Sequence, residues 1–109
     1  MHVISQKTLR LFWERHPTNE SSLRAWYHVV KKADWRHPDD IKNTFGRRVD
    51  QYRQFTIFDI GGNKCRLIAV LNFQNRRLFV RGVLTHPEYD RGDWKRDKFD
   101  VKRFGKGGK

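Results

Sequence analysis

Hydrophobic residues recur at helical spacing through the first half of the chain. Leu9, Phe12 and Trp13 share one face of a predicted helix, and Ser5 can cap its N-terminus. A second helix, with the clearest period in the sequence, is expected after Asn19. Its apolar positions are Leu23, Trp26, Tyr27 and Val30.

Two shorter elements accompany these helices. The β-branched residues Val3 and Ile4 predict a brief first strand. Pro38 is followed by two aspartates, which match the positive N-terminal end of a helix dipole. A third, short helix is therefore expected from Pro38 to near Gly46.

From Tyr52 onward the pattern changes to β-branched and aromatic runs separated by turn residues. The expected order is a strand at residues 54–60, a Gly61-Gly62 turn, a strand at 63–73, a polar reversal at 74–77 and a strand at 78–84. The sequence thus predicts a single α+β domain in which N-terminal helices pack on an antiparallel β-sheet meander.

The expected hairpin registers place side chains on two faces of this sheet. A Gly61-Gly62 turn puts Asp59 opposite Lys64, and a turn at residues 75–76 puts Val70 opposite Arg81. One face of the middle strand is then purely apolar and faces the helices: Cys65, Leu67, Ala69 and Leu71. The other face carries three cations among apolar residues: Lys64, Arg66, Ile68, Val70, Arg81 and Val83.

A short helical turn is expected directly after the last strand. Residues 85–88 match the capping-box pattern Thr-x-x-Glu, and His86 and Tyr89 lie three residues apart on one side of that turn. The turn carries both side chains towards Lys64 and Arg66. The sequence therefore predicts that cations, an imidazole and a phenol converge.

This combination suits the cleavage of a phosphodiester bond. A base takes the ribose 2′-OH proton, an acid protonates the leaving 5′-oxygen, and fixed cations stabilise the phosphorane. His86 is the natural acid or base because imidazole titrates near neutral pH. The sequence contains no metal-ligand spacing, so we expect neither a metal nor another cofactor.

Composition and charge agree with a nucleic-acid target. The 109 residues carry a formal net charge of +12, which attracts polyanions. No apolar run approaches a membrane span and no signal peptide is visible. Cys65 is the only cysteine and is expected in the core, which excludes an intramolecular disulfide. These features favour a cytoplasmic protein with no membrane partner.

Plainer interpretations stay open at several positions. Asp59 and Lys64 can form a simple cross-strand ion pair, and His86 can serve only its capping turn. The basic stretch from Arg91 is either a solvated tail or a contact surface for RNA. Within it, Trp94 and Phe99 are able to dock on the domain.

Three segments together resemble a known family. They are residues 1–5 (MHVIS), 58–68 (FDIGGNKCRLI) and 80–90 (VRGVLTHPEYD). They are similar to the HigB toxins of bacterial type II toxin–antitoxin systems, over about residues 1–92. This resemblance implies the RelE/ParE-like fold and a ribosome-dependent mRNA interferase that needs no metal. It assigns residues 1–92 to the toxin domain and 93–109 to a basic C-terminal extension whose last residues are expected to be mobile.

The resemblance also implies partners and site residues. The expected partners are a cognate helix-turn-helix antitoxin of the HigA type, mRNA, and the ribosome through its 16S rRNA surface, with operator DNA reached only through the antitoxin complex. The implied catalytic residues are His86, Arg81, Lys64, Arg66 and Tyr89. The implied RNA-binding residues are Asn63, Lys64, Arg66, Arg81 and Tyr89.

The sequence thus predicts an endoribonuclease toxin that inhibits translation. Two alternatives remain: a non-catalytic RNA- or ribosome-binding repressor, and a ParE-like gyrase inhibitor.

Overall fold

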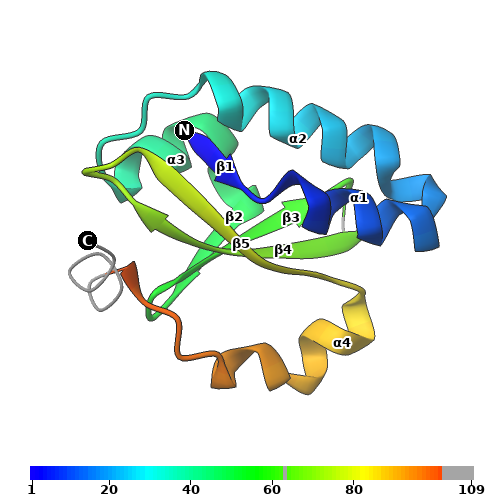
Figure 1. Cartoon of the computed structure of the whole chain (residues 1–109). Helices are drawn as coiled ribbons and strands as arrows, with labels where there is room; N and C mark the ends of the chain where they lie inside the picture. The colour runs from blue at the N-terminus through cyan, green and yellow to red at the C-terminus, as the bar shows by residue number, and fades with distance from the viewer. Residues whose placement is uncertain (63, 102–109) are drawn as a thin grey trace.

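The computed structural model describes residues 1–62 and 64–101 as an α+β fold (Figure 1). Asn63 and residues 102–109 lie outside the described residues. The elements in chain order are β1 (His2–Ile4), α1 (Gln6–Arg15), η1 (Pro17–Asn19), α2 (Glu20–Lys32), α3 (Pro38–Phe45), η2 (Gly46–Arg48), β2 (Val49–Tyr52), β3 (Phe55–Ile60), β4 (Cys65–Asn72), β5 (Arg77–Leu84), α4 (His86–Arg91) and η3 (Asp93–Arg96). The three predicted N-terminal helices are confirmed.

The five strands form one sheet in the order β1-β5-β4-β3-β2. Strands β2 to β5 are antiparallel neighbours, which confirms the meander. Strand β1 joins the opposite edge and runs parallel to β5, with Val3 across from Leu78. The sequence predicted this strand but not its parallel pairing with β5. A parallel pair needs a crossover connection, which here consists of the elements between the two strands.

The edge strand β2 was not predicted. Its sequence is Val-Asp-Gln-Tyr, and among its residues only Val49 is buried. An edge strand has only one neighbour in the sheet and tolerates polar residues, so it lacks the alternating apolar signal of a central strand.

The register between β3 and β4 differs from the expected one. Asp59 lies opposite Arg66, not Lys64, because residues 61–64 all belong to the connection rather than the two glycines alone. A shift of two residues preserves the side-chain faces. The apolar face predicted for β4 therefore does pack against the helices.

A β-bulge changes the register between β4 and β5. Ile68 pairs with Gly82, while the next residue, Ala69, pairs with Val80. Arg81 is the extra residue of the bulge, so the expected pairing of Val70 with Arg81 is wrong. The bulge also turns Val83 into the helix-facing core, which corrects its predicted place on the cationic face.

Two hydrophobic clusters lie on the two sides of the sheet. The larger one joins the sheet to α1, α2 and α3, which cover one face (Figure 1). The smaller one lies on the other face, beneath α4 and the C-terminal segment, and its buried members are Phe55, Ile57, Ile68 and Val70. The buried Cys65 belongs to the larger cluster, and burial raises the pKa of its thiol to about 11.

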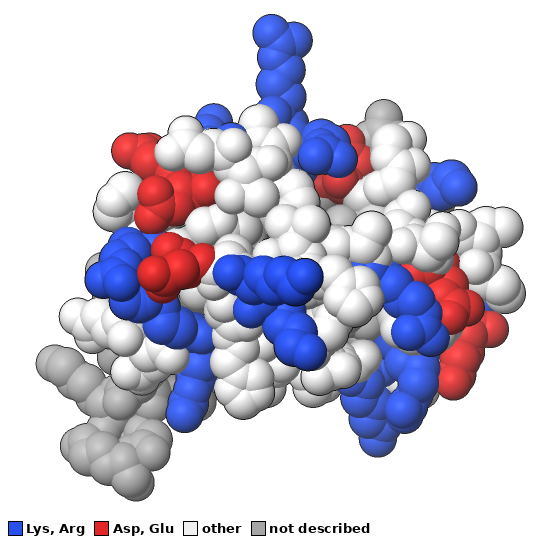
Figure 2. All heavy atoms as spheres, turned by 90° about the horizontal axis from the view of Figure 1, so that it is seen from above, with Lys and Arg blue, Asp and Glu red and all other residues white. Residues whose placement is uncertain are grey.

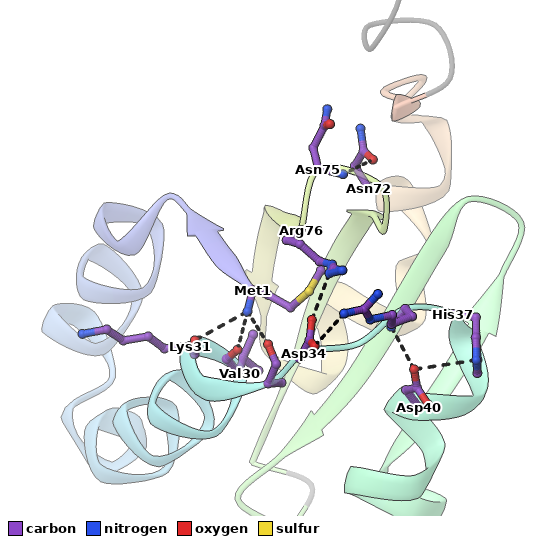
Figure 3. A network of polar contacts seen from close by, with 11 residues as sticks. Met1, Val30, Lys31, Asp34, His37, Asp40, Asn72, Asn75 and Arg76 are labelled. Carbon is purple, nitrogen blue, oxygen red and sulfur yellow. Dashed lines mark hydrogen bonds and ion pairs between the residues drawn. The ribbon is translucent and has the colours of Figure 1, made fainter.

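Polar contacts tie the end of α2 to the sheet edge (Figure 3). The Met1 amino group donates hydrogen bonds to the carbonyl oxygens of Val30 at 3.1 Å and Ala33 at 2.6 Å. Arg76, from the β4–β5 turn, donates to Asp34 at 2.9 Å. These contacts hold the helical layer on its side of the sheet and leave the other face to the C-terminal segment.

Part of the basic C-terminal extension is packed on the sheet. Trp94, Phe99 and Val101 contact the smaller hydrophobic cluster, so residues up to 101 lie against the folded body. The remaining residues of the extension, which carry the cations Lys102, Arg103, Lys106 and Lys109, lie outside the described part of the chain.

Candidate functional site

Arg81 stands at the bulge on the sheet face that α4 partly covers. Its Nε and Nη2 atoms lie 2.6 Å and 3.3 Å from the two carboxylate oxygens of Asp97, so the ion pair is bidentate. The Phe99 ring lies under the guanidinium, 4.4 Å from ring centroid to Cζ. Arg81 also lines a cavity of about 290 Å³ between β5, α4 and η3.

Arg66 lies on the same side of the sheet but is largely buried. Its side chain is 16% exposed, and its Nη1 lies 3.0 Å from Asp59 Oδ1. The expected ion pair of Asp59 with Lys64 is thus formed with Arg66 instead. Because Asp59 neutralises much of its charge, Arg66 contributes less to the field at the site than a free cation would.

Tyr89 and Arg66 come together as the sequence predicted. The guanidinium of Arg66 lies over the Tyr89 ring, 5.3 Å from its centroid. Trp94 stacks on Tyr89 with centroids 5.3 Å apart and planes 10° apart. Since two neighbours already contact this ring, its hydroxyl group rather than its face is the part suited to meet an RNA phosphate.

His86 is the first residue of α4 and lies partly in solvent. Its side chain is 44% exposed, and Nδ1 lies 3.9 Å from Asp90 Oδ2. The turn that presents it is a complete capping box: Thr85 N–H donates to Glu88 Oε1 at 2.9 Å, and Glu88 N–H donates to Thr85 Oγ1 at 3.4 Å. The capping turn therefore orients the imidazole while leaving it accessible.

Lys64 lies at the end of the β3–β4 connection, exposed to solvent. The connection is seated on α2: a Cβ at Gly61 would lie 2.9 Å from Ser22 Oγ and 3.3 Å from Lys64 Cδ. Gly61 also has a φ of +63°, so a glycine is needed there. Asn63, the predicted RNA-contacting residue of this turn, lies outside the described residues.

The capping turn supports a direct stability prediction. Replacing Thr85 by alanine should lower the free energy of unfolding by about 1 kcal/mol, because the first turn of α4 loses its cap. Urea unfolding measures this, with Ser21→Ala on the exposed side of α2 as the matched control. An unchanged unfolding midpoint for Thr85→Ala would contradict the prediction.

Glu88 gives this cap a pH dependence. The hydrogen bond from the Thr85 backbone holds the pKa of Glu88 below its ordinary value of 4.5. Because folding lowers this pKa, the stabilisation is present above the unfolded value and is lost as pH falls through the folded value. A Glu88→Gln variant should lack this part of the acid sensitivity.

The sequence did not identify Asp97 or Gln54 as residues near the site. Asp97 pairs with Arg81, and Gln54 Nε2 donates to the carbonyl oxygens of Asp97 at 3.1 Å and Phe99 at 3.2 Å. The sequence feature that could have indicated Asp97 is its place as the single aspartate between the aromatic residues Trp94 and Phe99, in an otherwise basic stretch.

Charge on the helical side of the molecule is more dispersed. Figure 2 shows Lys and Arg there in separate groups, several of them beside Asp or Glu. Arg24 pairs with the half-exposed Glu20 at 2.7 Å, and Arg10 pairs with Glu14 at 3.8 Å on exposed positions. The combination of a cavity, a bidentate arginine and an accessible imidazole belongs to the α4 side of the sheet.

Within residues 1–62 and 64–101, no helix has both the length and the apolar character needed to cross a membrane. In the same part of the chain, no three or more His, Cys, Asp or Glu side chains are grouped so that they could hold a metal ion.

Comparison with known proteins assigns the chain to a family. Residues 19–92 match the family model described as HigB_toxin, RelE-like toxic component of a toxin-antitoxin system. The chain is 32% identical over 94 residues to the mRNA interferase HigB of Escherichia coli O6:H1, covering 84% of this chain and 90% of that protein. It is 31% identical over 93 residues to the mRNA interferase toxin HigB of Escherichia coli K12, covering 83% and 88%. Together with the RelE-like α+β fold, these matches show that the chain belongs to the HigB family of toxins.

Proposed function

We propose that this toxin is an endoribonuclease that cleaves mRNA on the ribosome without a metal ion. The observation that carries the proposal is the arrangement on the α4 side of the sheet. Arg81 lies at the edge of a cavity, and the half-exposed His86 begins the helix that borders it. The relatives that the chain resembles are named mRNA interferases, which agrees with this chemistry.

Each proposed residue has a role that its position allows. His86 acts as the general acid or base because its imidazole is accessible and histidine is the side chain most often used for proton transfer. Arg81 stabilises the charge of the phosphorane through its N–H groups. The Tyr89 hydroxyl orients a phosphate, and Arg66 holds the Tyr89 ring in place. Lys64, which is exposed next to the start of β4, binds the message, and the family resemblance implies the same role for Asn63.

The proposed partners follow from charge and family. A chain with a net charge of +12 is attracted to the ribosomal RNA that surrounds a translated message. As the toxin of a toxin–antitoxin pair it has an antitoxin, which we propose is of the helix-turn-helix HigA type. An acidic antitoxin would associate rapidly with this basic chain. The toxin would then reach operator DNA only through that complex, and it would act in the cytoplasm.

The test combines expression with mapping of RNA ends. Induced expression of the wild-type chain should arrest growth and create new 5′ ends within translated messages. Purified protein should cut mRNA on programmed ribosomes much faster than the same mRNA free in solution. Growth arrest with intact messages would instead indicate a non-catalytic repressor, and DNA damage without RNA cleavage would indicate a gyrase inhibitor.

The proposed metal independence of cleavage requires a separate experiment, because Mg²⁺ cannot be removed without disrupting the ribosome itself. A phosphorothioate at the scissile phosphate should slow cleavage, and Mn²⁺ or Cd²⁺ should not restore the rate. Rescue by either ion would show that a metal contacts that phosphate and would contradict this part of the proposal.

His86 is the residue that separates catalysis from binding. We predict that His86→Ala lowers the cleavage rate on saturated ribosome complexes by about 10²- to 10⁴-fold, the usual contribution of a general acid or base. Its affinity for ribosomes should stay near the wild-type value. His28→Ala, at an exposed position of α2, is the matched control and should cleave normally. Cleavage by His86→Ala at the wild-type rate would remove His86 from the mechanism.

A further inference from the structure

We propose that residues 93–101 form part of the RNA-binding site, and that Asp97 within them is a positioning residue that holds Arg81 at the cavity. This inference rests on the proposed function, because it takes Arg81 as the group that meets the phosphate. It changes the role of the basic extension: its described part completes the site rather than only adding positive charge outside it.

The position of Arg81 explains why a positioning group is needed. At the bulge, Arg81 has no partner residue on β4, because Ile68 pairs with Gly82 and Ala69 with Val80. A bulge redirects a side chain and interrupts the regular ladder around it. The long Arg81 side chain therefore has less support from the sheet than its neighbours, and its guanidinium must be oriented by other groups.

Asp97 supplies that orientation. Its carboxylate contacts Nε and Nη2 of Arg81, which fixes the plane of the guanidinium over the Phe99 ring. A guanidinium has five N–H bonds, so this pairing leaves about three of them for a phosphate. The pair is only partly exposed, with side-chain exposures of 36% for Arg81 and 25% for Asp97.

Asp97 is itself held by the protein. The Phe99 backbone N–H donates to Asp97 Oδ1 at 3.0 Å, and Gln54 from the β2–β3 turn donates to the Asp97 carbonyl oxygen at 3.1 Å. Partial burial alone would raise the pKa of Asp97, but the hydrogen bonds from Arg81 and Phe99 hold that pKa below its ordinary value. The carboxylate is therefore charged at neutral pH and fixed in space.

The segment that carries Asp97 is firmly docked. Trp94 Nε1 donates to the Tyr89 carbonyl oxygen at 3.0 Å, and the indole packs edge-on against Tyr52 and Phe55 with centroids 5.5 Å away in each case. The Phe99 ring lies 5.0 Å from that of Phe79. Releasing the segment would expose these aromatic surfaces to water. This cost favours a fixed support for Arg81 over a cover that opens to admit RNA.

The docked segment also closes one side of the cavity at Arg81. The cavity has a volume of about 290 Å³, near the lower end of the range for small-molecule sites. Its walls are apolar at Ile68, Leu84 and Trp94, and its charged residues are of both signs: Arg81, Arg91, Glu88, Asp93 and Asp97. Arg91 lies 3.6 Å from Asp93, so the N–H groups of Arg81 that Asp97 does not occupy are the donors for a phosphate. The size suits one nucleotide of a single strand, with its phosphate at Arg81.

The test is the Asp97→Asn variant, which removes the charge and keeps the shape. We expect its cleavage rate on saturated ribosome complexes to fall about 10- to 100-fold, since small misplacements of a reacting group have effects of this size. Its affinity for the complexes should be unchanged or higher, because one negative charge has been lost. Asp97→Glu, which keeps the carboxylate, should recover part of the rate. Asp50→Asn on β2 is the charge-matched control.

The outcomes separate this inference from the proposed function. If the wild-type chain cleaves and folded Asp97→Asn cleaves equally fast or faster, the positioning role is wrong, and a faster rate would show that Asp97 restrains the site. If the wild-type chain itself does not cleave RNA, the proposed function fails and this inference fails with it. Where Asp97→Asn is unstable, a folded Asp97→Ser variant, which also lacks the carboxylate, decides: a rate equal to or above wild type contradicts the positioning role.

Discussion

Replacing Arg81 by alanine should abolish growth arrest and lower mRNA cleavage by about 10²- to 10³-fold, the effect of removing one donor to a developing negative charge. Arg81 is one of two arginines that line the cavity, and its guanidinium is already oriented by Asp97. Growth after induction and the cleavage rate on programmed ribosomes measure the result. Arg77→Ala, an exposed arginine at the other end of β5, is the matched control and should stay active.

Two further variants separate charge from geometry and from folding. Arg81→Lys keeps the charge but loses the planar fork, so it should also lose most of its activity. Arg81→Ala leaves the Asp97 carboxylate without its arginine, which can lower stability. The double variant Arg81→Ala with Asp97→Ala removes both charges and should regain stability without regaining cleavage. A stable, soluble Arg81→Ala protein that cleaves at the wild-type rate would remove Arg81 from the site.

The largest stability effect is expected at Phe58. This residue is 1% exposed and is surrounded by aromatic rings, with centroids 5.3 Å from Trp26, 5.2 Å from Phe45 and 6.3 Å from Trp35. Phe58→Ala should lower the free energy of unfolding by about 3–5 kcal/mol, because it removes apolar contacts and leaves a cavity. Domains are stable by only about 5–15 kcal/mol, so the variant should lie close to unfolding.

Urea unfolding tests this prediction. The midpoint for Phe58→Ala should fall strongly while the slope of the transition stays the same. Phe73→Ala, at a phenylalanine only partly buried against the same cluster, should cause a smaller loss. A loss below about 1 kcal/mol for Phe58→Ala would mean that the core relaxes around the missing ring, contrary to dense packing.

The helices, the helix cap and the two faces of the central strand could be predicted from the sequence of this protein. The spacing of Leu23, Trp26 and Val30 predicted a helix that buries all three residues, and Thr85 with Glu88 predicted a capping box that the structure contains. The apolar alternation in β4 predicted which of its faces meets the helices. Such features depend on neighbours within a few positions along the chain, so periodicity and capping chemistry determine them.

The arrangement of the candidate site was decided by tertiary structure. The pairing of Asp59 with Arg66 depends on the length of the β3–β4 connection, and the position of Arg81 depends on a β-bulge. Neither feature can be recognised from the local amino-acid composition. The parallel edge strand β1 and the polar strand β2 likewise follow from the neighbours available to them.

The contact of Asp97 with Arg81 shows the reason most clearly. The two residues are 16 positions apart, and the segment that carries Asp97 lies beside Arg81 where Trp94 and Phe99 pack on the outer sheet face. The sequence by itself determined the helices, the order of the central strands, the excess of positive charge and the residues of the toxin family motif. Only the tertiary structure decided which cations are neutralised and oriented by carboxylates, because that depends on contacts between segments that no local pattern links.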